Sequence, residues 1–232
     1  MHVAEMLLLA LILAFPLLDN GLARIGRGNT LHGYYCTVLA LWLPTVWLLV
    51  LYANRQLSVP DLGLSLPQGW PLLACIAALL LLAGYILVAV RAVATDRETA
   101  QLVAAKLQDH RELLPATREQ ALVFCLMVST SAGFCEELLF RGYLLPLLRE
   151  HLGLAAAVLA SSLCFGLWHA YLGWKAVTRT TLLGLLLAGV FLATDSLWAA
   201  IALHVLIDIY SGLLAYFALR EAPAISRQSS TA

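Results

Sequence analysis

The strongest constraint on the fold is a series of apolar windows, each close to the length needed to cross a lipid bilayer. A helix of about 20 mostly apolar residues spans the hydrocarbon core, which is roughly 30 Å thick. Seven windows meet this requirement: 3–19, 31–53, 70–90, 119–149, 152–170, 176–194 and 197–220. The sequence therefore predicts an all-α, polytopic integral membrane protein with about 7–8 transmembrane helices.

Composition and charge support this fold class. Apolar residues make up 62% of the chain and charged residues only 12%, which is far from the usage of soluble domains. Fourteen basic and fourteen acidic residues balance, so we expect a lipid bilayer as the surrounding partner and no nucleic acid. Glu5 precedes the first apolar stretch and no Lys or Arg lies ahead of it. We therefore expect a retained first span and not a cleaved signal peptide.

The chain divides into four predicted parts. Residues 1–90 hold the N-terminal transmembrane helices, and residues 91–118 mix charges with scattered apolar side chains. That mixture is typical of an amphipathic helix at the membrane surface, here on the cytoplasmic side. Residues 119–220 form a C-terminal helical core. The Ser-rich tail, 221–232, is expected to be disordered.

The basic residues predict an orientation, because positively charged loops stay in the cytoplasm. With seven spans, Arg55 and Arg149 lie on one side of the membrane. Eleven other cations share the opposite side: Arg24, Arg27, Arg91, Arg97, Lys106, Arg111, Arg118, Lys175, Arg179, Arg220 and Arg227. We therefore expect a multi-pass protein of the bacterial inner membrane, with the N-terminus outside and the C-terminus in the cytoplasm.

The 119–149 window is longer than one span and contains two adjacent acids, Glu136 and Glu137. We interpret it as one long tilted helix that bends near Pro146. At 1.5 Å per residue, Glu136 then lies about 20 Å below the outer end of its helix, and His169 about 26 Å below the same surface. The two side chains are predicted to reach a similar depth.

Six ionisable side chains are concentrated in three C-terminal helices, although each costs about 2.5 to 3.5 kcal/mol inside a membrane. Helical spacing of four residues relates three pairs, since such residues share a face: Glu137 with Arg141, Phe165 with His169, and His204 with Asp208. Glu137 and Arg141 are expected to form an ion pair. Glu136, about 100° around the helix, points elsewhere and is available for catalysis.

These residue types suit water activation. A carboxylate in a pocket away from bulk water can act as a general base, and the histidines can share the proton or polarise a carbonyl. His204, with Asp208 one turn further on, could stabilise an oxyanion. Glu136, His169 and His204 could also hold one divalent metal ion such as zinc. The HExxH motif is absent, so the sequence leaves metal dependence open.

Three motifs in separate apolar helices resemble those of the CAAX protease and bacteriocin-processing (CPBP, or Abi) family, which includes the Ras-converting CAAX endopeptidase. They are Glu136 to Arg141 as EExxxR, Phe165 to His169 as FxxxH, and His204 to Asp208 as HxxxN/D. The resemblance covers roughly residues 119–215 and implies that 119–220 is the catalytic core of a helical intramembrane endopeptidase. The family pattern usually has Asn at the last position, and an ionised Asp cannot donate a hydrogen bond.

By motif, the resemblance assigns water activation to Glu136 and His169, and assistance with the oxyanion to His204 and Asp208. Glu137, Arg141 and Phe165 would support them. The implied substrate is a membrane-associated protein or peptide with a CAAX-like, leader or C-terminal sorting segment. Family members include enzymes described as glutamate-dependent and as metalloproteases.

Two other functions remain open at the sequence level. Intramembrane Glu, His, Asp and Arg side chains also build the relays of proton- or ion-coupled transporters, although no inverted repeat is evident. A catalytically silent membrane scaffold or immunity protein would keep the fold without the chemistry.

Overall fold

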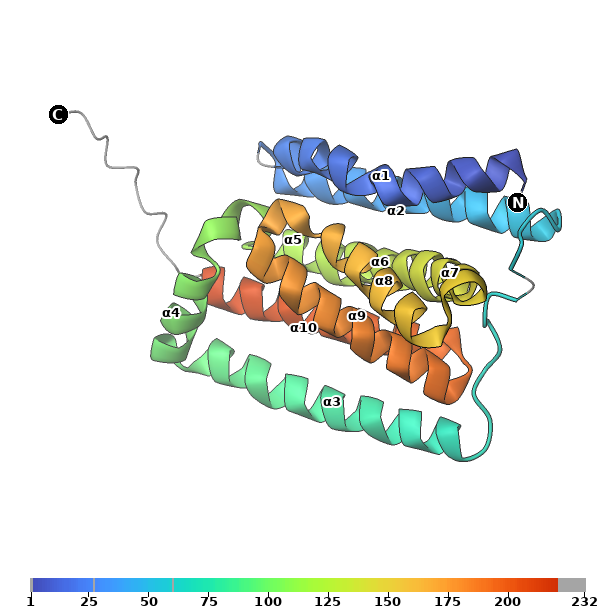
Figure 1. Cartoon of the computed structure of the whole chain (residues 1–232). Coiled ribbons are helices and arrows are strands. Elements are labelled where there is room, and N and C mark those ends of the chain that lie inside the picture. The colour runs from blue at the N-terminus through green and yellow to red at the C-terminus, as the bar shows by residue number, and fades with distance from the viewer. Residues whose placement is uncertain (1, 27, 60, 221–232) are drawn as a thin grey trace.

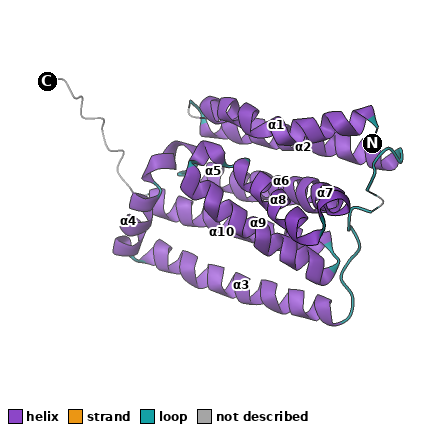
Figure 2. Cartoon of the chain, viewed as in Figure 1, coloured by secondary structure: helices purple, strands orange, loops and turns teal. Residues whose placement is uncertain are grey.

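A computed structural model describes residues 2–26, 28–59 and 61–220, and the described residues are helical with no β-strand (Figure 2). The fold class is therefore all-α, as predicted. The predicted disordered tail, 221–232, lies outside the described residues.

All seven apolar windows are helical. Their bounds, with the shorter 3₁₀ and π-helical pieces between them, are α1 (Val3–Gly26), α2 (Thr30–Ala53), α3 (Trp70–Thr95), α4 (Arg97–Lys106), η1 (Gln108–Leu113), α5 (Arg118–Val123), η2 (Phe124–Val128), α6 (Ser129–Glu137), η3 (Leu138–Leu144), α7 (Leu145–Leu152), α8 (Leu154–Leu167), η4 (Ala170–Leu172), α9 (Trp174–Thr194) and α10 (Leu197–Leu219).

The number of spans differs from the prediction. Among the described residues, five helices are long and apolar enough to cross a membrane: 30–53, 70–95, 118–152, 174–194 and 197–219. The described side chains of α1 cover only its first part, Val3–Pro16, and the apolar helix Leu154–Leu167 is shorter than a span. The 14 residues of α8 reach only about 21 Å at 1.5 Å per residue. Five candidate spans thus replace the expected 7–8, and they indicate a multi-pass membrane protein.

The helices run side by side in a bundle (Figure 1). The pair α1 and α2 covers one side, α3 lies at the opposite edge against α10, and α6 to α10 fill the space between them. The predicted segment 91–118 begins inside α3, which continues to Thr95, and α4 and η1 follow. These two elements lie at one end of the bundle, near the start of α9 and the end of α10 (Figure 1). The elements that carry most of the predicted cytoplasmic cations therefore meet at this end, which we call the cationic end.

The predicted long helix is confirmed as one continuous helical segment of 35 residues, Arg118–Leu152. A capping box starts it, in which Thr117 and Gln120 satisfy each other's backbone amides. The π-helical stretch η3 follows directly after the two glutamates and precedes Pro146. The segment therefore carries Glu136 and Glu137 in its middle, where it contacts α8 and α10.

Candidate active site

Glu137 and Arg141 form the ion pair that their spacing predicts. Arg141 Nη1 lies 2.8 Å from Glu137 Oε1, and both side chains are fully buried. Arg141 also donates through Nη2 to the Gly184 carbonyl of α9 at 2.8 Å. Its guanidinium lies 4.4 Å from the ring centre of Phe165 on α8. One residue of the long helix thus joins α8 and α9.

His204 lies against the same carboxylate. Its Nδ1 is 2.8 Å from Glu137 Oε1, and since a carboxylate only accepts, Nδ1 carries the proton. Its Nε2 is 3.8 Å from Glu136 Oε2 and 3.8 Å from Asp208 Oδ2. The spacing of four residues predicts only the pair of His204 with Asp208, because it predicts contacts within one helix. The contact of Glu137 with His204 joins two helices, α6 and α10, and residue spacing does not predict it.

Glu136, directly beside Glu137, has a different environment. Its side chain is buried, yet within the part of the chain that the structure describes, its Oε2 has no hydrogen-bond partner. Nε2 of His204 lies 3.8 Å from it, which is beyond hydrogen-bond distance. A buried carboxylate oxygen without a partner is unusual in a folded protein and calls for a ligand, a water or a reactive role.

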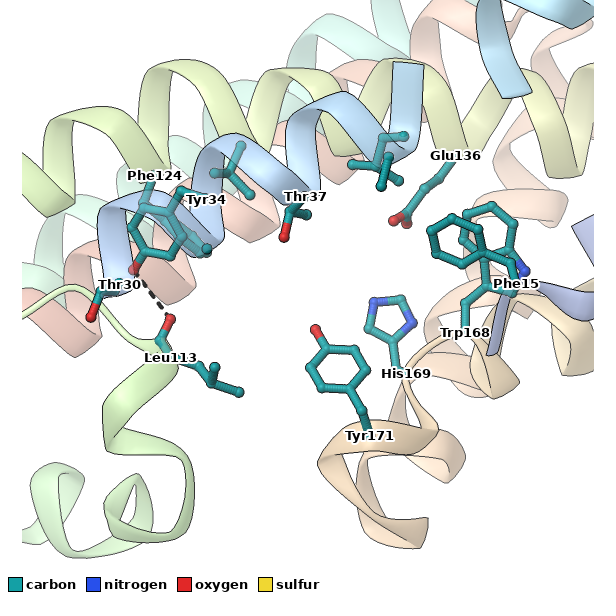
Figure 3. A pocket seen from close by; sticks show the side chains of 14 residues that line it. Phe15, Thr30, Tyr34, Thr37, Leu113, Phe124, Glu136, Trp168, His169 and Tyr171 are labelled. Atoms are coloured by element: carbon teal, nitrogen blue, oxygen red, sulfur yellow. Dashed lines mark hydrogen bonds between the residues drawn. The ribbon is translucent and has the colours of Figure 1, made fainter. Parts of the chain in front are cut away.

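That carboxylate borders a cavity. About 130 Å³ is open to the centres of water-sized molecules, whereas one water needs roughly 10–15 Å³ by the same measure. Glu136 and His169 face each other across it (Figure 3). His204 and Asp208 are not in its wall. The structure therefore brings Glu136 and His169 to one cavity, whereas His204 contacts Glu136 at 3.8 Å and Asp208 contacts His204 at 3.8 Å without lining it.

His169 lies where α8 has already ended. The helix stops at Leu167, and His169 has φ −101° and ψ 16°, outside helical geometry. Its Nδ1 is 3.2 Å from the Phe165 carbonyl, which can only accept, so Nδ1 donates and Nε2 keeps its lone pair. Nε2 of His169 can then accept a proton.

The remaining cavity wall comes largely from the N-terminal helices, which the sequence interpretation did not include. Lining residues outside the predicted site are Phe15, Thr30, Gly33, Tyr34, Thr37, Ala40, Leu41, Leu113, Phe124, Val128, Trp168 and Tyr171. Tyr34 donates its hydroxyl to the Leu113 carbonyl at 3.2 Å, and the Tyr171 ring stacks near His169 (Figure 3). The α2 members recur every three or four residues, so a small and polar stripe in an otherwise apolar helix was the available signal.

The metal alternative finds no support in this geometry. Among the described residues, no group of three or more His, Cys, Asp or Glu side chains could hold a metal ion. Metal binding by Glu136, His169 and His204, which the sequence leaves open, is therefore not supported among the described residues.

Comparison with known proteins gives one match. Residues 118–210 match the family described as type II CAAX prenyl endopeptidase Rce1-like. No curated protein and no solved structure matches the chain. The matched segment contains Glu136, Glu137, Arg141, His169, His204 and Asp208. The region 118–210 of this chain is thus a domain of the Rce1-like type II CAAX prenyl endopeptidase (CPBP/Abi) family.

Proposed function

We propose that this protein is an intramembrane endopeptidase that hydrolyses a peptide bond in a membrane-associated protein or peptide. One observation carries the proposal: Glu136, a buried carboxylate with no hydrogen bond to its Oε2 among the described residues, lines a cavity that can hold water, with His169 on the opposite wall. Membership of a protease family supports the same reaction class.

In the proposed reaction, a water lies between Glu136 and Nε2 of His169. Glu136 accepts a proton from this water while the water oxygen bonds to the carbonyl carbon of the substrate. The carbonyl oxygen gains negative charge, and a proton on Nε2 of His204 stabilises it, with Asp208 assisting from 3.8 Å. The carbon–nitrogen bond then breaks, and the proton held by Glu136 passes to the leaving amine.

In this mechanism Glu137, Arg141 and Phe165 hold the reacting groups. Glu137 accepts the Nδ1 proton of His204, which carries a second proton on Nε2, Arg141 neutralises Glu137, and the Phe165 carbonyl fixes His169. Both reacting histidines are oriented by a partner that does not itself meet the substrate, and such preorganisation is the main source of electrostatic catalysis.

We further propose that substrate reaches the cavity from the cationic end. Thr30, Leu113 and Tyr171 line the cavity, and they belong to elements at or next to that end (Figure 1). Because cationic loops stay in the cytoplasm, this end faces the cytoplasm of a bacterial inner membrane, and the N-terminus lies outside. A prenylated CAAX peptide is the first substrate class to test.

The test compares Glu136→Gln with Glu150→Gln in the full chain, reconstituted in nanodiscs with fluorogenic CAAX peptides, both prenylated and unmodified. Glu150 lies in the same continuous helix and is exposed. We expect Glu136→Gln to lower cleavage by about 10²- to 10⁴-fold and Glu150→Gln to leave it unchanged. Full activity of Glu136→Gln would remove the base assignment. Ion flux in proteoliposomes without peptide cleavage would favour a transporter, and neither activity would favour a scaffold.

A further inference from the structure

Helix α1 lies outside the segment that matches the protease family, yet it reaches the proposed active site. Phe15 lines the cavity that holds Glu136 and His169. Ile12, one turn earlier, is fully buried and belongs to the main hydrophobic core. The described part of α1 is therefore packed against the site and does more than anchor the chain in lipid.

A proline inside α1 creates an acceptor on this packed face. Pro16 lies within the helix and has no backbone N–H, so it cannot donate to the carbonyl of Ile12, four residues earlier. A buried carbonyl that loses its helical donor needs another one. The Trp168 indole supplies it: Nε1 donates to the Ile12 carbonyl at 2.9 Å.

Two aromatic rings also contact the Trp168 indole. Its ring stacks on Phe15 with centroids 3.9 Å apart and planes 18° apart. Phe140 of the glutamate-bearing helix meets it edge to face at 4.8 Å, and Trp168 is 3% exposed. One hydrogen bond and two ring contacts thus fix this side chain between α1 and η3.

Trp168 immediately precedes His169, and here the α8 helix no longer dictates the path of the chain. The His169 amide bonds to the Gly166 carbonyl, three residues back, in a tightened last turn. The placement of His169 therefore depends on contacts made by its neighbours. The contacts of Trp168 link the position of His169 to α1 through Ile12 and, through Phe140, to the helix that carries Glu136.

We infer that Trp168 is a positioning residue for His169, and that the proline-exposed carbonyl of Ile12 is the acceptor that anchors it. The inference rests on the proposed function, in which His169 and Glu136 flank one water. It makes α1 a working part of the active site. Loss of the anchor lets His169 drift from Glu136, and a displacement of about 1 Å can cost about 10²-fold in rate.

Two variants act on the same hydrogen bond from opposite ends, one by removing its donor and the other by adding a competing donor. Trp168→Phe keeps an aromatic ring between Phe15 and Phe140 but has no N–H. Pro16→Ala restores a backbone N–H that competes for the Ile12 carbonyl. We expect each to lower kcat by about 10- to 100-fold with KM within about twofold, because substrate contacts remain. The control is Trp174→Phe, since Trp174 is 76% exposed.

The double variant sharpens the test. If both changes act through one hydrogen bond, Pro16→Ala adds no further loss to Trp168→Phe, whereas independent effects would multiply. Multiplicative losses, or a kcat unchanged in either single variant, would overturn the inference.

A second readout does not depend on cleavage. In a ¹⁵N-histidine spectrum, with the His169 signals assigned by their loss in His169→Ala, the wild-type ring should show one tautomer protonated at Nδ1. Trp168→Phe and Pro16→Ala should both shift or split these signals. Unchanged signals would refute the positioning role even if peptide hydrolysis is established. An inactive wild-type protein whose signals shift in both variants would instead refute the proposed function and leave the positioning role standing.

Discussion

The two sides of the glutamate-bearing helix differ sharply, although Glu136 and Glu137 are adjacent in sequence. On the packed side, Glu137 is bound by Arg141 and His204, and Arg141 reaches the backbone of α9. On the cavity side, Glu136 keeps a buried oxygen with no hydrogen-bond partner among the described residues. Glu137 therefore stabilises the packing of the helices, whereas Glu136 is available to react.

The comparison shows how a membrane helix can carry two acids at one depth. A buried charge is tolerated when a counter-charge and hydrogen bonds offset its desolvation. On the packed side, Oε1 of Glu137 meets this condition through Arg141 and His204, each at 2.8 Å, although its Oε2 has no hydrogen-bond partner among the described residues. On the cavity side, Glu136 has only His204 at 3.8 Å and whatever occupies the cavity. Stability and reactivity are therefore assigned to neighbouring residues, and substitutions should separate them.

The largest expected effect on stability comes from Glu137→Gln. Arg141 then keeps its buried charge without a carboxylate, a loss of about 3 to 5 kcal/mol when one partner of a buried pair is removed. Glu136→Gln, the matched change one position earlier, should leave stability unchanged or raise it. Unfolding of both variants in mixed micelles, followed by circular dichroism, measures the difference. Equal stability of the two variants would show that the packed side does not depend on the ion pair.

Gly184→Ala should have a smaller effect on the same side. A Cβ at this position would lie 3.1 Å from Phe165 Cδ1 and 3.2 Å from Arg141 Nη2. Such crowding typically costs about 1 to 3 kcal/mol. Gly189 lies in the same helix with nothing within 4 Å of its Cβ position, so Gly189→Ala should instead gain up to about 1 kcal/mol from helix propensity. The same unfolding measurement should show that Gly184→Ala lowers the free energy of unfolding and Gly189→Ala raises it. A change of the same sign in both variants would contradict the close packing of Gly184 against Arg141.

Sequence patterns foresaw the elements of this comparison that lie along one helix. Each of the seven apolar windows contains a helix, and the spacing of four residues predicted the Glu137–Arg141 pair, which the structure confirms. The count of spans failed because apolar length in a window does not show where a helix stops. The window 152–170 ends in a turn at His169, and α8 is too short to cross the membrane.

Contacts between helices could not be read from the sequence in the same way. The bond from His204 to Glu137 joins residues 67 positions apart, and the bond from Trp168 to Ile12 joins residues 156 apart. Both depend on how α1, α8 and α10 pack against the long helix. The roles of Glu136, His169, His204 and Asp208 in catalysis remain predictions that the substitutions test.

The smallest structural effect is expected from Asp208→Asn, at the far edge of the site. The Asp208 side chain is 27% exposed and lies 3.8 Å from Nε2 of His204. Because asparagine has nearly the same shape, Asp208→Asn should change the free energy of unfolding by no more than about 0.5 kcal/mol. If this position assists the oxyanion, the asparagine amide supplies a donor that an ionised carboxylate lacks. Asp208→Asn should then cleave peptide at least as fast as the wild type.

Asp208→Ala is the matched control, because it lacks the donor that asparagine supplies, and its kcat should be about 10²- to 10³-fold lower than that of Asp208→Asn, as the loss of an oxyanion donor requires. Steady-state cleavage of one peptide by the three proteins decides the matter. If asparagine is as poor as alanine, the negative charge on Asp208 is what His204 requires, and the cavity side depends on a second carboxylate after all.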